Sequence, residues 1–178
     1  MPRLFTGLEI PSDLALDLAM LRGGLSGARW IDTENYHLTL RFIGDIDGAT
    51  ARDISAALEQ IRRPPFTVTL EGLDFFGGGR PRAIIAKAKP AAPLVELQAE
   101  QERLIRRIGI SPEPRKFTPH ITLARLRDAS AAAVAAYLAA RGFFFSRRFE
   151  ATRFVLFSSR AATGGGPYLV EAAYPLGA

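Results

Sequence analysis

Polar and apolar residues alternate along several short stretches of this chain, a pattern typical of strands that bury one face. The clearest stretch begins at Phe66, where Phe66, Val68 and Leu70 share one face and threonines share the other. Other stretches are shorter or less regular but end at glycine, proline or charged residues in the same way. Strands are therefore predicted over residues 3–10, 29–31, 36–43, 66–73, 82–88, 121–125, 143–148, 152–158 and 167–174.

Apolar residues recur at helical spacing between these strands. The longest such segment carries apolar residues at positions 94, 97, 104, 105 and 108, which fall on one side of a helix. Helices are predicted over residues 13–21, 50–61, 92–108 and 129–140. Strands and helices alternate irregularly, and short connections join some strands directly. This order predicts an α+β fold with largely antiparallel sheets rather than a doubly wound parallel sheet.

One four-residue pattern occurs twice, nearly half the chain apart. His37-Leu38-Thr39-Leu40 is matched by His120-Ile121-Thr122-Leu123, and these are the two histidines of the sequence. In a strand the histidine and threonine share one face, about 6.6 Å apart, and the aliphatic residues share the other. Each copy begins a predicted strand that precedes a helix. We therefore predict a bilobal, pseudo-symmetric α+β fold, with two mainly antiparallel sheets lining a central cleft and helices outside.

A single histidine beside a strand is most often structural, and His-x-Thr alone is a weak pattern. The duplication favours catalysis, because both histidines have the same sequence context. Imidazole titrates near neutral pH, so two imidazoles across a cleft suit acid–base chemistry on a phosphate. The hydroxyls of Thr39 and Thr122 suit the charged oxygens of that phosphate. The alternative for both threonines is simple β-propensity.

Length and composition narrow the class of protein. A chain of 178 residues suits one domain, residues 1–178, of two lobes that share a core. Disulfides, thiolate catalysis and cysteine zinc sites are excluded because the sequence has no cysteine. With two histidines and no carboxylate cluster beside them, we expect no metal and no other cofactor.

The net charge is +5 and the sequence pI is about 10.1, with most of the positive charge on arginine. Guanidinium groups pair well with phosphates, so an anionic partner is favoured, although a compositional bias towards arginine would give the same charge. The first residues lack the apolar core of a signal peptide. No run of roughly 18 apolar residues suggests a membrane span. We therefore expect a cytoplasmic protein.

Four segments together carry a family resemblance over essentially the whole chain: RLFTGLEIP, NYHLTLRFIG, FTPHITLAR, and FVLFSS followed by GGGPYLVEAAYPL. They resemble the bacterial and archaeal RNA 2′,3′-cyclic phosphodiesterases, named 2′-5′ RNA ligases, of the 2H phosphoesterase superfamily. The resemblance implies a bilobal fold with both motifs in its cleft. It also implies metal-independent hydrolysis of a terminal 2′,3′-cyclic phosphate on RNA to a 2′-phosphate, with weak reverse 2′-5′ ligation.

The resemblance also implies roles for the four motif residues. His37 is expected to be the acid that protonates the leaving 3′ oxygen, and His120 the base that activates water. Thr39 and Thr122 are expected to bind the phosphate. The residues themselves leave the assignment of acid and base open.

Four further residues are candidates for substrate binding. Arg41 has the strand parity of Thr39 and is expected to point into the cleft and pair with a phosphate. Arg125 is an odd number of residues from His120, so in a regular strand the two side chains point to opposite faces. Arg125 therefore reaches the cleft only if its strand bends or ends. Tyr168 is a candidate for stacking on a base. Phe117 is another, although core packing is favoured for it.

Two alternatives stay open at this point. One is a 2H phosphoesterase acting on a small cyclic phosphate instead of RNA. The other is an RNA-binding module with little turnover, which an intact pair of His-x-Thr motifs argues against because a binder needs no imidazole pair. In each case we expect a monomer.

Overall fold

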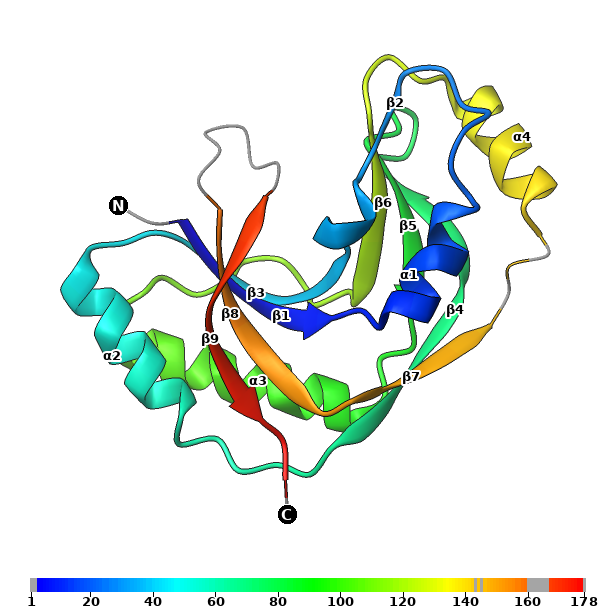
Figure 1. Cartoon of the computed structure of the whole chain (residues 1–178). Helices are drawn as coiled ribbons and strands as arrows, with labels where there is room; N and C mark the ends of the chain where they lie inside the picture. Colours follow the sequence, from blue (N-terminus) through cyan, green and yellow to red (C-terminus); the bar gives the residue numbers. More distant parts are fainter. Residues whose placement is uncertain (1–2, 143, 145, 160–166, 178) are drawn as a thin grey trace.

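The computed structural model describes residues 3–142, 144, 146–159 and 167–177. Within this part of the chain, nine strands form one antiparallel sheet with the order β7-β4-β5-β6-β3-β1-β8-β9, and β2 pairs with β6 (Figure 1). The strands are β1 (Arg3–Glu9), β2 (Ala28–Trp30), β3 (His37–Asp45), β4 (Phe66–Phe76), β5 (Ala83–Ala88), β6 (His120–Leu126), β7 (Arg147–Ala151), β8 (Arg153–Ser159) and β9 (Tyr168–Pro175). The helices are α1 (Ser12–Ala19), α2 (Gly48–Leu58), α3 (Ala92–Arg107) and α4 (Ala131–Ala140), with a short 3₁₀ turn η1 (Thr33–Asn35) before β3.

The sheet consists of two halves that meet at the motif strands. In the described residues, β3 pairs with β6 through one residue pair, Leu38 with Ile121. One half is β3-β1-β8-β9 and the other is β6-β5-β4-β7, so each motif strand is the innermost strand of its half. The predicted α+β class and antiparallel pairing are confirmed. The two expected sheets are joined into one at the Leu38–Ile121 pair.

Both motif strands contain a β-bulge directly after the His-x-Thr pattern. Along β3 and β1, Gly7 faces Thr39 but Thr6 faces Arg41, so Leu40 has no partner of its own. The backbone N–H of Arg41 donates to the Thr6 hydroxyl at 3.1 Å. A bulge places two consecutive side chains on one face, and here both Leu40 and Arg41 are buried.

The bulge in β6 is in the equivalent place. Ile85 of β5 faces Thr122, whereas Ile84 faces Ala124, and Leu123 lies between. Leu123 and Ala124 are both buried, and Arg125 is exposed. After each bulge, side chains therefore point to the opposite face of the sheet from the one that strict alternation predicts.

The helices hold the two halves together. α3 packs against β3 and β4, one strand from each half, while α4 packs on β4 (Figure 1). A single hydrophobic cluster takes in buried residues of both halves and of all four helices, among them Leu38, Ile54, Leu97, Ile121 and Val134. The halves thus share one core, although their sheets meet at a single residue pair.

One predicted strand is misplaced. The run of phenylalanines suggested a strand over residues 143–148, but β7 spans Arg147–Ala151. Phe149 and Ala151 are buried between exposed or half-buried polar residues, so alternation marks the true strand better than the aromatic run does. Residues 143 and 145 lie outside the described residues. No helix in the described ranges is both long enough and apolar enough to cross a membrane.

Candidate active site

The two histidines begin the two motif strands and lie close to the junction of the halves. Extending the Leu38–Ile121 pairing by one residue in each direction puts His37 beside Thr122 and Thr39 beside His120. In this register the two imidazoles are diagonal neighbours, and the charge of His120 acts on His37. All four side chains are half-buried on the same face of the sheet. The structure therefore brings the four motif residues together.

Each imidazole is anchored in the same way by the chain just before it. His37 Nδ1 lies 2.8 Å from the carbonyl oxygen of Asn35, and His120 Nδ1 lies 2.6 Å from that of Thr118. A carbonyl oxygen can only accept a hydrogen bond, so each Nδ1 carries the proton and donates it. In the neutral form, both Nε2 atoms then have a free lone pair available to a ligand.

Three aromatic rings of the described residues lie close to His37. Its ring centre lies 4.9 Å from that of Phe5, 5.1 Å from that of Tyr168 and 5.8 Å from that of Phe157. Tyr168, predicted as a base-stacking residue, presents a ring nearly perpendicular to the imidazole, at 87°. These contacts restrict rotation of the imidazole and reduce its hydration.

Among the described residues, His120 has one aromatic neighbour of this kind. The ring of Phe76, at the end of β4, lies 4.7 Å away and is perpendicular to the imidazole. Sequence reasoning missed Phe5, Phe76 and Phe157, because an aromatic residue in a strand is most simply a core residue. Phe117 is partly buried against the main hydrophobic cluster, as its core-packing alternative expects.

Burial makes both imidazoles less basic. The pKa of His37 is lowered from 6.5 to about 4, chiefly by burial; its bond to Asn35 opposes the shift, and the charges of His120 and Arg125 add to it. The pKa of His120 is also lowered by burial, against its bond to Thr118, and the charge of Arg115 contributes. Both histidines are therefore mainly neutral at pH 7 in the free protein.

The expectation that Arg41 points into the cleft is wrong. Its side chain is 4% exposed and forms an ion pair with Glu102 of α3 on the opposite face of the sheet from His37. It also donates to the carbonyl oxygen of Ser111 at 2.6 Å. The physical reason is the bulge at Leu40, which moves Arg41 to the buried face.

Two other arginines supply positive charge to the site. The bulge in β6 returns Arg125 to the exposed face, and its charge acts on His37. This is the bend that the sequence required for Arg125 to reach the cleft. Arg115, which sequence reasoning missed, acts on His120 from the connection before β6. Its guanidinium is held by Glu113 at 3.1 Å and is 81% exposed.

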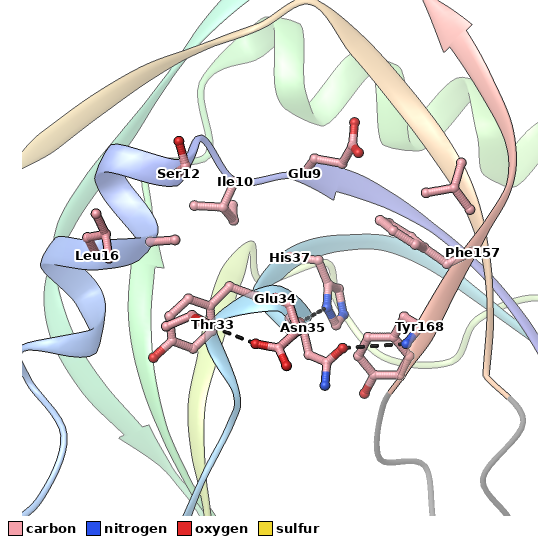
Figure 2. Close-up of a pocket in the computed structure, with 13 residues that line it drawn as sticks. Glu9, Ile10, Ser12, Leu16, Thr33, Glu34, Asn35, His37, Phe157 and Tyr168 are labelled. Carbon is pink, nitrogen blue, oxygen red and sulfur yellow. Dashed lines mark hydrogen bonds between the residues drawn. The ribbon is translucent and has the colours of Figure 1, made fainter.

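A pocket of about 420 Å³ opens beside His37 (Figure 2). Its walls come from the end of β1, from α1, from η1 and from β8 and β9. Figure 2 shows Glu34, Asn35, His37 and Tyr168 around it. Asn35 contributes its backbone carbonyl to His37 and accepts a hydrogen bond from the Tyr168 backbone N–H through Oδ1, at 3.4 Å.

Metal ligands do not gather anywhere in the described residues. No group of three or more histidine, aspartate or glutamate side chains is close enough to hold an ion in that part of the chain. What the arrangement can do chemically is transfer protons through two imidazoles and attract an anion through two arginines.

Comparison with known proteins shows the family to which this chain belongs. The sequence profile described as "LigT like Phosphoesterase" matches twice, over residues 8–86 and 85–168. The chain belongs to this family. The first match contains the His37 motif and the second contains the His120 motif. This agrees with the division of the sheet into two halves, each with one motif strand.

Relatives in the family carry a consistent name. The chain is 31% identical to an RNA 2′,3′-cyclic phosphodiesterase of Escherichia coli over 170 residues, covering 93% of this chain and 92% of that protein. It is 36% identical to one from Aeropyrum pernix over 118 residues, covering 63% and 67%. The crystal structure of E. coli LigT complexed with 3′-AMP superposes with a TM-score of 0.79 at 26% identity, over 99% of each chain. TT0787 of Thermus thermophilus shares the fold, with a TM-score of 0.81 at 23% identity over 98% of this chain and 97% of that one.

Proposed function

We propose that this protein hydrolyses a terminal 2′,3′-cyclic phosphate on RNA to a 2′-phosphate, using two histidines and no metal. The observation that carries the proposal is the matched pair of imidazoles, each fixed by a carbonyl at Nδ1 so that Nε2 is free for proton transfer. Membership in the LigT-like family and the names of the relatives support the substrate.

The reaction needs two proton transfers and a place for negative charge. His120 Nε2 takes a proton from water as its oxygen attacks phosphorus, and His37 gives a proton to the 3′ oxygen as the P–O3′ bond breaks. Each transfer is typically worth about 10²- to 10⁴-fold in rate. Thr39, Thr122 and the guanidinium of Arg125 supply hydrogen bonds and charge to the phosphorane oxygens.

The low pKa of His37 bears on its proposed role as the acid. The imidazolium of His37, with a pKa near 4, is a strong acid once protonated and gives up its proton readily. An anionic phosphodiester between the histidines favours that protonated form, because a nearby negative charge raises an imidazole pKa. The substrate thus charges the acid that it needs.

The alternative enzymatic function is hydrolysis of a small cyclic phosphate that is not part of RNA. The net charge of +5 and the exposed Arg115 favour a polyanion, because a small substrate has no further phosphates for these cations to bind. Weak 2′-5′ ligation is the same displacement with the 5′-hydroxyl of a second RNA in place of water: its oxygen attacks phosphorus, the P–O3′ bond breaks, and a 2′-5′ phosphodiester forms when the two RNA ends are held together.

One assay tests the proposal. A short RNA ending in 2′,3′-cyclic phosphate is incubated with the protein, and the product is analysed for a phosphomonoester. Conversion at a rate that depends on both histidines supports the proposal. Binding without turnover indicates an RNA-binding module, and turnover of small cyclic phosphates alone indicates the alternative enzyme.

A further inference from the structure

The pocket beside His37 has a different chemical character from the rest of the site. Its lining combines the apolar side chains of Ile10, Leu16, Phe157 and Val170 with the carboxylates of Glu9 and Glu34. Among the described residues that line it, none is lysine or arginine. Arg115 and Arg125, by contrast, act on the histidines from outside this lining. RNA phosphates are therefore attracted to the arginines rather than to the pocket.

The size and walls of the pocket suit a nucleobase. A volume of about 420 Å³ lies in the range of small-molecule sites, and flat apolar walls stack on bases. Tyr168 and Phe157 contribute aromatic rings, while Leu16 and Val170 are 66% and 50% exposed and leave apolar surface uncovered at its edge. In the proposed mechanism, the ribose that carries the cyclic phosphate lies against His37, so its own base would be within reach of this pocket.

The two carboxylates differ in what they can still bind. Both oxygens of Glu9 accept from Arg153, at 2.6 and 2.9 Å, so Glu9 is occupied. Glu34 is exposed and accepts one long hydrogen bond, of 3.4 Å, from Thr33. A carboxylate accepts about four hydrogen bonds. Glu34 therefore has acceptor capacity left for a ligand in the pocket.

We propose that this pocket binds the base of the terminal nucleotide, and that Glu34 selects bases by their amino and imino N–H groups. Guanine presents N1–H and an adjacent amino group, a pair that a carboxylate can accept together. Cytosine and adenine present one amino group each. Uracil presents a single N–H between two carbonyl oxygens, which a carboxylate repels. The order of preference is therefore guanine first and uracil last. This inference rests on the proposed function, since it concerns the substrate of the same site.

Binding of the base at Glu34 should also affect His37, because both residues contact or belong to η1. Glu34 precedes Asn35, whose carbonyl fixes His37 and whose side chain holds the Tyr168 backbone. A base that orders η1 therefore orders the imidazole as well. We expect the preference in kcat as well as in KM.

The test compares 2′,3′-cyclic GMP with 2′,3′-cyclic UMP. For the intact protein, the ratio of kcat/KM values, guanine over uracil, should be at least about tenfold, the discrimination expected of one good two-bond pairing. Glu34→Gln removes the charge and one acceptor and should bring the ratio down at least about fivefold. Glu34→Asp should keep part of it. Glu59→Gln, an exposed carboxylate at the end of α2 outside the pocket lining, is the matched control and should leave the ratio as it is.

Calorimetric binding of guanosine and uridine 3′-monophosphates to the same variants provides a readout that needs no turnover. Equal values for the two bases in the intact protein, or an unchanged ratio in Glu34→Gln, would overturn the base proposal while hydrolysis itself stands. A gain in affinity for oligonucleotides in Glu34→Gln would show that a backbone phosphate occupies the pocket. Absence of hydrolysis with guanine-selective binding would instead sink the proposed function and keep the pocket.

Discussion

Arg41 of β3 and Glu102 of α3 form a buried ion pair directly behind the first His-x-Thr motif. Arg41 also donates to the Ser111 carbonyl, and Glu102 accepts from the backbone N–H of Glu113 at 3.1 Å. Glu113 in turn holds Arg115. The pair therefore connects the first motif strand to the segment that carries Arg115 and leads to His120.

Loss of Arg41 should destabilise the protein strongly. Arg41→Ala leaves the mostly buried carboxylate of Glu102 without its partner, and breaking a buried pair in this way costs about 3–5 kcal/mol. Urea unfolding measures the change. Arg103→Ala, an exposed arginine next to Glu102 on α3, is the control and should change the free energy of unfolding by no more than about 0.5 kcal/mol. Equal midpoints for the two variants would contradict a structural role for the ion pair.

Both histidines should be essential for turnover. His37→Ala and His120→Ala should each lower kcat by at least about 10²-fold, the low end for a lost acid or base. Their combination should be much less than multiplicative, because the two groups act on one transition state. Steady-state kinetics on a cyclic-phosphate substrate measures this. Near-normal turnover in either single variant would remove that histidine from the mechanism.

The pH dependence should place the optimum of kcat/KM below pH 6.5. In the active form of the free enzyme, one histidine is protonated and the other is neutral. The pKa values of both histidines are below 6.5. Above pH 6.5 the singly protonated form declines, so kcat/KM should fall by about tenfold per pH unit. The kcat profile should lie at higher pH, because the bound anionic phosphate raises both pKa values. A kcat/KM that stays flat or rises between pH 6.5 and 8 would contradict these shifts.

Activity should survive removal of metal ions. Proton transfer and charge stabilisation are both assigned to side chains, namely the two histidines, the two motif threonines and Arg125. Exhaustive treatment with EDTA followed by the cyclic-phosphate assay should leave kcat unchanged. Inactivation by EDTA and recovery with a divalent ion would mean that these side chains do not supply the whole chemistry.

The product should carry its phosphate on the 2′ oxygen. In-line displacement breaks the bond opposite the attacking water, so the acid decides which ester oxygen leaves. With His37 against the 3′ oxygen, the P–O3′ bond breaks. Phosphorus NMR of the hydrolysed terminus distinguishes the 2′- from the 3′-phosphate. A 3′-phosphate as sole product would leave the two-histidine chemistry intact but reverse the substrate orientation.

Alternation and helical spacing were sufficient to predict most of the fold. The segment over residues 92–108 was predicted as a helix, and α3 spans Ala92–Arg107. These patterns succeed because burial on one face imposes a fixed period on the sequence. They fail at residues 143–148, where the run of aromatic residues predicts a strand but the observed strand β7 spans Arg147–Ala151.

Only those features of the site that depend on the identity of side chains could be predicted from the sequence. The His-x-Thr duplication marked the motif residues, but alternation does not reveal where a bulge adds a residue, so Arg41 was assigned to the wrong face. The bonds that fix His37 and His120 come from backbone carbonyls, which any residue at positions 35 and 118 would provide. Arg115 lies in a proline-rich connection whose path depends on its contacts with Glu102 and Arg41.

The paired bulges place different side chains at equivalent positions of the two motif strands. They bring Phe42 and Arg125 to equivalent positions in the two motif strands, both on the face of the histidines. The backbone is thus nearly repeated, but one copy presents a phenyl ring, 43% exposed, where the other presents a guanidinium. A cyclic phosphate turned end for end would exchange its charged neighbour for an apolar one. In the proposed mechanism, each histidine is therefore expected to keep the same half of the reaction from one turnover to the next.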